Sequence, residues 1–219
     1  MGTLWERIMS NRKEKVDSPQ NEKERADQAL KNLLLEKIRD TIRTWDQEGI
    51  YAVSLWVNDE NDNPCTPSIT LGYNTEAHYE SQIDHASSAG EARWNYAFWL
   101  QNEELYFGGE SSAEIKEWVL ANGFPYYTEH ELFYEVDPDE EEDEAIHAIT
   151  GAFVRILIQE VQELHASGFV REKFGKDLPV LIHELEYYDE ILDQNIRANG
   201  FLPVHEFVSF WDGEWSDDQ

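Results

Sequence analysis

The chain has 219 residues, of which 41% are hydrophobic and 13% aromatic, so it can bury a substantial core and is not a disordered acidic chain. Its single cysteine, Cys65, excludes an internal disulfide framework and a cysteine-rich zinc site. The sequence has no run of about 18 apolar residues and no apolar signal-peptide core. We therefore expect no membrane span and a cytoplasmic location.

The net charge of -29 is unevenly distributed along the chain. Residues 1–43 hold 10 basic and 8 acidic residues, whereas residues 44–219 hold 7 basic against 38 acidic residues, a net charge of -31. A field of this sign repels nucleic acid and anionic membranes and attracts cationic partners. On its own the charge favours a solvated surface that keeps the protein soluble, and the alternative is a surface that binds a basic protein. The oligomeric state stays open.

The N-terminal part of the chain divides into an arm and a helix. Residues 1–20 are polar and poor in core-forming residues apart from Leu4, Trp5 and Ile8, which predicts a mobile arm or a short, loosely docked helix. Over residues 21–47, apolar residues recur at spacings of three and four, which predicts an amphipathic helix. We expect Gly49 to end it, because glycine adopts the left-handed conformation at little cost.

A hairpin follows this helix. Residues 50–57 alternate with the two-residue period of a strand that has at least one buried face. Residues 67–74 predict a second strand, and Pro67 suits its start. The intervening segment DENDNPCTP is rich in turn-forming Asp, Asn and Pro. The sequence therefore predicts two strands joined by an acidic turn.

The next segment contains a short helix and two histidines. Asn74 or Thr75 can cap a helix over residues 76–82. His78 and His85 lie in a run that is polar on all sides and has no recognised metal-ligand spacing. We therefore expect two exposed histidines and no metal site there.

The segment ARWNYAFWLQN suits either a strand or a helix, and both interpretations bury it. The helical interpretation gains a capping box from Ser88 and Glu91. Arg93 is one of two cations in a strongly acidic region. We expect it to form an ion pair with a nearby carboxylate, because a single arginine without a glycine-rich loop does not make an anion site.

Beyond residue 104, the pattern predicts a short strand at LYFG, a small amphipathic helix capped by Ser111 or Ser112, and a strand over residues 130–136. A main core helix follows, with Asp137 as its cap and Pro138 at its first position. Carboxylates over residues 139–144 are favourable near a helix N-terminus. Six in succession exceed what capping requires, so the surplus is a candidate for binding or for solubility.

The last third begins with PVLI, an apolar run suited to a buried strand, and continues with a helix over residues 186–198. Residues 201–211 suit a strand or a helical turn, and residues 213–219 suggest a frayed acidic tail. Together the elements predict one α+β domain over residues 21–212, with an antiparallel or mixed sheet flanked by helices.

Catalytic motifs are sparse. Three His-Glu pairs occur, none of which extends to HExxH, and there is no phosphate loop or dinucleotide fingerprint, so we expect neither a cofactor nor a metal. Cys65 lies beside prolines without a cation or histidine to lower its pKa, which argues against a nucleophilic role. One alternative is a metal-dependent hydrolase. Its residues would be His183, Glu184, Glu186, Asp189 and Glu190.

The acidic residues of two segments are the candidate binding residues for a basic protein. The first segment is the hairpin turn and the second is the start of the main helix. The residues are Asp59, Glu60, Asp62, Asp139, Glu140, Glu141, Glu142 and Asp143.

Three stretches carry a resemblance to a known family. They are SLWVNDENDNPCTPSITLGYNTE, SSAGEARWNYAFWLQN and LPVLIHELEYYDEILDQNIRAN. Over roughly residues 24–198, the chain resembles an uncharacterised family of acidic bacterial cytoplasmic proteins, some of which are suspected immunity proteins encoded near polymorphic-toxin loci. The resemblance implies a sheet covered by helices and a binding role, and it supplies no catalytic residues. The resulting expectation is an acidic binding protein that neutralises a basic toxin, with a regulatory scaffold as a further alternative.

Overall fold

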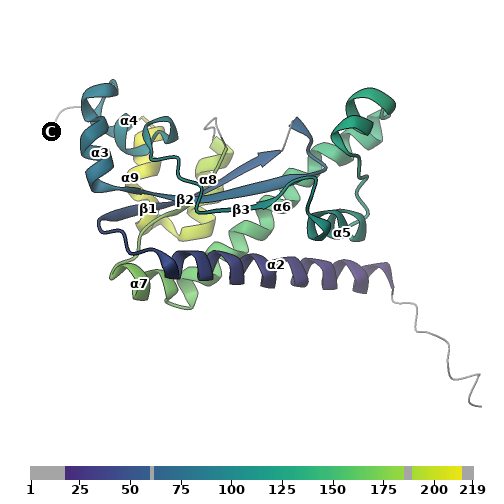
Figure 1. Cartoon of the computed structure of the whole chain (residues 1–219), viewed down its shortest axis with the longest axis horizontal. Coiled ribbons are helices and arrows are strands. Elements are labelled where there is room, and N and C mark those ends of the chain that lie inside the picture. The colour runs from purple at the N-terminus through teal and green to yellow at the C-terminus, as the bar shows by residue number, and fades with distance from the viewer. Residues whose placement is uncertain (1–17, 60–61, 185–188, 214–219) are drawn as a thin grey trace, which may run out of the picture.

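A computed structural model of the chain describes residues 18–59, 62–184 and 189–213 (Figure 1). Most of the expected N-terminal arm and acidic tail lie outside these residues. The described part forms four strands and the helices around them, and it confirms a single α+β domain.

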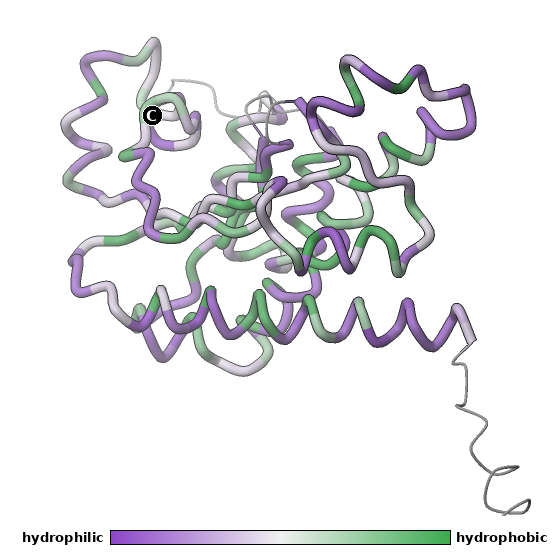
Figure 2. Tube along the Cα trace, turned by 45° about the vertical axis from the view of Figure 1, so that its right-hand side comes forward, coloured by the Kyte–Doolittle hydropathy of each residue, from purple (hydrophilic) through white to green (hydrophobic). Residues whose placement is uncertain are grey.

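The first helix, α2 (Pro19–Thr44), begins where the side chain of Ser18 accepts a hydrogen bond from the backbone N–H of Asn21. It buries the apolar stripe that the sequence predicts: Leu30, Leu34, Ile38 and Ile42. In Figure 2 the tube of α2 alternates between short hydrophobic and hydrophilic stretches, as an amphipathic helix requires.

The helix ends three residues earlier than expected, because the chain turns extended at Trp45. There the indole packs edge-on against Tyr73, with 4.7 Å between ring centroids. Lys173 Nζ donates to the backbone oxygens of Arg43 and Trp45, at 3.0 and 2.6 Å, which satisfies carbonyls at this helix end. Gly49, with φ of +72°, therefore serves the turn into the first strand instead of ending the helix.

The sheet is mixed. The predicted hairpin forms β1 (Ile50–Asp59) and β2 (Pro67–Thr75), which pair antiparallel. β3 (Leu105–Gly108) pairs antiparallel with β2, and β4 (Val180–His183) pairs parallel with β1. The strand order is β3-β2-β1-β4, so β1 is central and β4 is an edge strand.

The free edge of β4 is closed by asparagine side chains of α8 (Asp189–Asn199). Asn199 accepts from the N–H of Val180 at 2.8 Å and donates to its carbonyl at 3.0 Å. Asn195 makes the equivalent pair with Ile182, at 2.8 and 2.7 Å. Two asparagines one helical turn apart therefore replace a neighbouring strand and prevent open pairing at this edge.

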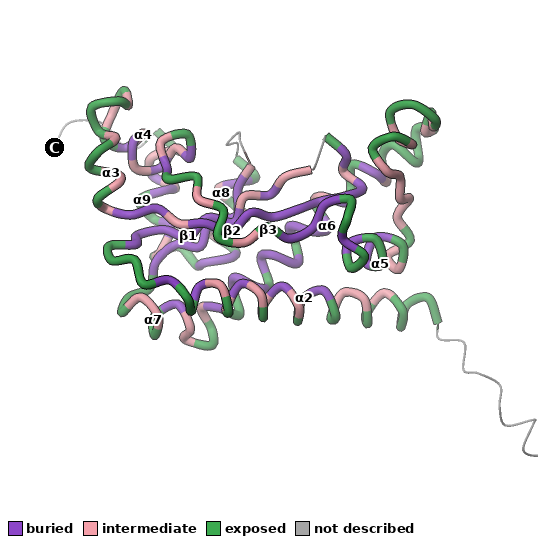
Figure 3. The backbone as a smooth tube through the Cα atoms, viewed as in Figure 1, coloured by how far each residue is buried: buried purple, intermediate pink, exposed green. Residues whose placement is uncertain are grey.

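The two faces of the sheet carry different cores (Figure 3). One face packs on α2, α5 (Ala113–Ala121) and the long helix α6 (Glu140–Ala166), through aliphatic residues such as Val53 and Leu55. The other face packs on α4 (Ala89–Trp94), on a 3₁₀ turn η3 (Tyr96–Phe98) and on α9 (Phe201–Trp211). This second core is rich in aromatic residues: Tyr51, Trp94, Tyr96, Trp99 and Phe207.

Several short elements match the sequence. Thr75 caps α3 (Glu76–Gln82), and Ser112 caps α5. The ambiguous segment is helical at its start, where Ser88 accepts from the N–H of Glu91 as the capping box requires. A 3₁₀ turn η2 (Ile83–His85) and the helix α7 (Phe169–Phe174) complete the described elements.

Two expectations are wrong, and a third is not tested. Residues 130–136 form no strand but a π-helical turn, η4 (Glu131–Glu135), because the side chain of Glu131 accepts from both the N–H and the hydroxyl of Thr128. The cap of α6 is Asp139, which accepts from the N–H of Glu142 at 3.0 Å, and not Asp137. The expected helix start at residue 186 lies outside the described residues, and the described helix α8 begins at Asp189.

Candidate functional site

The first predicted acidic set lies at the end of β1 and in the loop that follows. Both carboxylate oxygens of Asp59 accept from the hydroxyl of Thr150 on α6, at 2.9 and 2.8 Å. Burial raises the pKa of Asp59 above its usual value, although the Thr150 hydrogen bond opposes this shift. Asp59 therefore links the sheet to α6 and presents little charge outward. Glu60 lies outside the described residues, and Asp62 is exposed.

The loop is held in place by Asn63, which is fully buried. Its side-chain nitrogen donates to the backbone oxygen of Tyr127 at 2.9 Å, while its side-chain oxygen accepts from the N–H of Cys65 at 3.0 Å. The hydroxyl of Tyr127 in turn donates to Glu142 on α6 at 3.3 Å. A chain of contacts thus connects the hairpin turn to the start of α6.

The second predicted acidic set opens α6. Asp139 and Glu142 serve the helix cap and the tyrosine contact, and Asp143 lies 3.5 Å from His147 Nδ1. Glu140 and Glu141 are exposed in the first turn. The structure therefore brings together two acidic sets that lie about eighty residues apart in the sequence, at the end of the molecule where β1 and α6 meet (Figure 1).

Two exposed aromatic side chains lie on the turn that precedes α6 in the chain and were not predicted as site residues. Phe133 is 52% exposed and Tyr134 is 77% exposed, both on η4, which leads into α6. The sequence signal was available, since two aromatics sit inside an acid-rich segment, but the strand interpretation placed one of them in the core. We call the exposed group of Asp62, Phe133, Tyr134, Glu140 and Glu141 the acidic end.

His183, the centre of the hydrolase alternative, is completely buried. Its Nε2 lies 2.7 Å from the hydroxyl oxygen of Ser54 on β1, and its Nδ1 lies 3.0 Å from the carbonyl of Glu184. The carbonyl can only accept, so Nδ1 carries the proton and Nε2 accepts from Ser54. Burial lowers the pKa of His183 to about 4, so the ring is neutral at pH 7.

Those carboxylates of the hydrolase alternative that the structure describes form no metal-binding group with His183. Glu184 is half-buried, whereas Asp189 and Glu190 are exposed in the first turn of α8. Glu186 lies outside the described residues. Across the ranges that the structure covers, no three His, Cys, Asp or Glu side chains are grouped as a metal would require. The partner of His183 is instead Ser54, which depends on the parallel pairing of β1 with β4 and has no local sequence signal.

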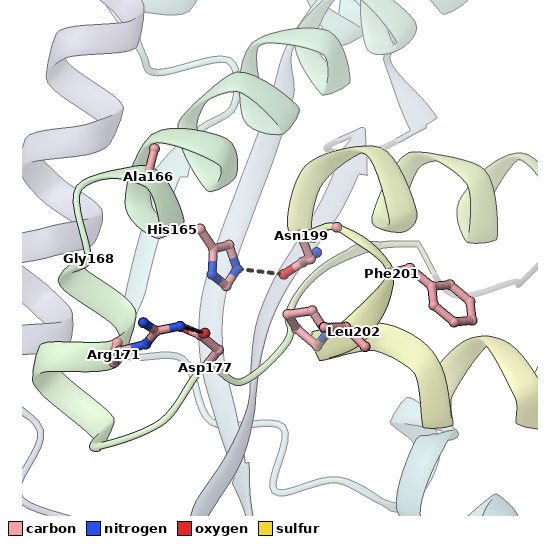
Figure 4. A pocket seen from close by; sticks show the side chains of 10 residues that line it. His165, Ala166, Gly168, Arg171, Asp177, Asn199, Phe201 and Leu202 are labelled. Atoms are coloured by element: carbon pink, nitrogen blue, oxygen red, sulfur yellow. Dashed lines mark hydrogen bonds and ion pairs between the residues drawn. The ribbon is translucent and has the colours of Figure 1, made fainter.

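A cleft of about 580 Å³ opens between the C-terminal end of α6, α7 and the junction of α8 with α9 (Figure 4). Its polar groups are already engaged: His165 Nε2 lies 3.0 Å from Asn199 Oδ1, and Arg171 forms an ion pair with Asp177. Phe201 and Leu202 form an exposed apolar lip, as Figure 4 shows. The cleft thus offers a concave apolar surface, but the polar side chains named above already have partners within the protein.

The remaining sequence expectations can now be compared with the structure. Arg93 forms the expected ion pair, bidentate to Glu76 at 2.8 and 3.0 Å, and its Nε lies 3.4 Å from Glu206. His85 is exposed as expected, but His78 is half-buried, because its Nε2 contacts the backbone oxygen of Phe98 at 3.1 Å. Burial raises the pKa of the Cys65 thiol, which disfavours the reactive thiolate.

None of the helices in the described part of the chain has the length and apolar character needed to cross a membrane. No protein-family model matches the chain, and neither does any curated protein or solved structure.

Proposed function

We propose that the protein is an acidic protein-binding module whose partner is a basic protein, bound at the acidic end. The observation that supports this proposal is the exposure of Asp62, Glu140 and Glu141 where the hairpin loop is connected to α6, together with two exposed aromatic rings on η4, which leads into α6. No Lys or Arg occurs between Lys116 and Arg155, so the segment that contains η4 and the start of α6 carries a strong excess of negative charge.

The two kinds of residue have different roles in binding. The carboxylates raise the association rate with a cationic partner and discriminate against acidic ones. Phe133 and Tyr134 supply the apolar area that slows dissociation, because aromatic side chains are over-represented among residues that dominate binding energy. Charge alone would give weak, salt-sensitive association.

The family resemblance gives the proposal its narrower form, an immunity protein that neutralises a basic toxin by covering its active face. The alternative of a regulatory scaffold uses the same acidic end and differs in the partner that it binds. Neither form requires a catalytic group in this chain.

Co-expression tests the narrower form. The protein would be produced together with the products of the genes adjacent to its own, and growth would be scored. We expect protection from one toxic product, and we expect the double substitution Phe133→Ser with Tyr134→Ser to abolish it. Replacing Leu202, an equally apolar and 86% exposed residue of the cleft lip, by Ser is the matched control and should preserve protection.

Affinity capture at low and moderate salt tests the broader form. A cationic partner should be retained at both salt concentrations by the unaltered protein and only at low salt by the aromatic double variant. Capture of no cationic protein would overturn the proposal, and capture that survives the double substitution at moderate salt would place the binding surface elsewhere.

A further inference from the structure

The N-terminal turns of α2 leave a groove that faces α5. In Figure 1, α2 extends past the edge of the sheet, and α5 lies beside the projecting part. The two helices are fixed to each other by Asp27, whose carboxylate accepts from Trp118 Nε1 at 2.8 Å and from Asn122 at 3.1 Å. The groove between them therefore has a defined shape.

The groove has an apolar floor with charged residues among its lining, and it begins at Pro19. Its larger section, about 600 Å³, starts at Pro19. Its smaller section, about 90 Å³, continues to Leu33 and Trp118, and both sections share Ala26 and Ala29. Leu120 stands at its rim with 53% of its surface exposed. An apolar surface of this kind is a candidate for docking.

We infer that the groove is the docking site of the chain's own N-terminal segment, with Leu4, Trp5 and Ile8 as the inserted side chains. These are the core-forming residues of the segment, and their spacing of three and four places them on one side of a helical turn.

Reach and attachment favour this occupant over any other. The groove extends along α2 from Pro19 to Leu33, about 21 Å at 1.5 Å per residue. The eleven residue-to-residue steps from Ile8 to Pro19 can span up to about 37 Å when extended, so the segment can reach the whole groove. Covalent attachment gives it a high effective concentration, on the order of millimolar, that a free partner must exceed.

Charge gives a second argument. Residues 1–17 carry four basic side chains, at Arg7, Arg12, Lys13 and Lys15, against three acidic ones, so their net charge is +1. Glu22 and Glu117 line the larger section of the groove, and Glu114 lines the smaller one. Arg25 is the cation of the lining. The groove lining and residues 1–17 therefore carry net charges of opposite sign, which favours their association.

Site-specific photo-crosslinking of the full chain tests the assignment. A benzophenone amino acid would replace Leu120, and the crosslinked peptides would be mapped by mass spectrometry. We expect intramolecular crosslinks to residues 4–8 at a yield independent of protein concentration, and we expect Leu4→Ser with Trp5→Ser to remove them. The same probe at Leu202 is the matched control and should give no crosslink to this segment.

Other outcomes overturn the inference. Crosslinks whose yield rises with concentration would assign the groove to a second copy of the chain. Crosslinks only to neighbouring residues of α2 and α5 would show that the segment lies elsewhere. Far-ultraviolet circular dichroism of each variant would confirm that α2 and α5 are folded, so that a missing crosslink reports on docking.

Discussion

The side-chain amide of Asn63 donates a hydrogen bond to the backbone oxygen of Tyr127, with 2.9 Å between nitrogen and oxygen. Through this contact the hairpin turn is fixed to the segment that leads into η4 and α6. The acidic end is therefore built by a buried neutral hydrogen bond, while its charged groups remain at the surface.

Replacing Asn63 by Ala should destabilise the protein by about 2 kcal/mol, because it leaves the N–H of Cys65 and the carbonyl of Tyr127 buried without their partner. Urea unfolding would measure the loss. Asn32→Ala on the exposed side of α2 is the control and should change stability little. Equal effects of both substitutions would contradict the assigned role of Asn63.

Glu160 should make the stability depend on pH. It is 4% exposed on α6, and burial raises its pKa to about 7, with opposing influence from Lys31 and Arg39. The folded state therefore holds a proton that the unfolded state releases near pH 4.5. Protonated Glu160 therefore gives its full contribution to the free energy of unfolding below pH 4.5. This contribution is lost as the pH rises through 7, which lowers the free energy of unfolding by up to about 3 kcal/mol.

We therefore expect Glu160→Gln to raise the free energy of unfolding at pH 8 and to have little effect at pH 4.5. Glu144→Gln, an exposed residue of the same helix that does not act on Glu160, is the control and should not change the slope. Unfolding curves across this pH range would check both, and parallel pH profiles for the protein and its Glu160 variant would sink the idea.

His183 should make the stability depend on pH in the direction opposite to Glu160. Its pKa is lowered from 6.5 to about 4, so the unfolded chain takes up a proton near pH 6.5 while the folded protein does not. Neutral His183 gives its full contribution to the free energy of unfolding above pH 6.5. This contribution is lost as the pH falls towards 4, which lowers the free energy of unfolding by up to about 3 kcal/mol. In the Glu160→Gln variant, where the opposing group is absent, stability should fall clearly with acidification. A flat acid limb in that variant would contradict the buried, neutral state of His183.

Asn195→Ala should cost more than Gln194→Ala, although both side chains contact the carbonyl of Ile182. Asn195 also accepts from the N–H of Ile182, so its loss leaves this buried N–H without its acceptor, whereas the carbonyl keeps Gln194 as a donor. We expect a destabilisation of about 3 kcal/mol for Asn195→Ala and about 1 kcal/mol for Gln194→Ala. Chemical denaturation would compare them, and the reverse order would refute the role of Asn195 in closing the sheet.

The elements with local patterns could be predicted from the sequence. The alternation of residues 50–57 and the stripe of α6 reflect burial on one side, which shows directly in the spacing of apolar residues. The strand expected over residues 130–136 failed because alternation alone cannot reveal whether a partner strand exists, and here Phe133 and Tyr134 face solvent.

The candidate site depended on contacts that no local pattern encodes. Both acidic sets were visible as composition, but their meeting depends on Asn63 with Tyr127 and on Asp59 with Thr150, pairs separated by 64 and 91 residues. The pairing of Ser54 with His183 spans 129 residues and follows from a parallel strand contact. Such long-range contacts are set by packing of the whole domain.

The central claim is that a basic protein binds at the acidic end, and hydrogen–deuterium exchange of the full chain with and without its captured partner tests it most directly. The account predicts slower exchange over residues 131–143 and 62–66 in the complex. Protection confined to α7 and the start of α9, around the cleft lined by Arg171 and Leu202, would contradict it.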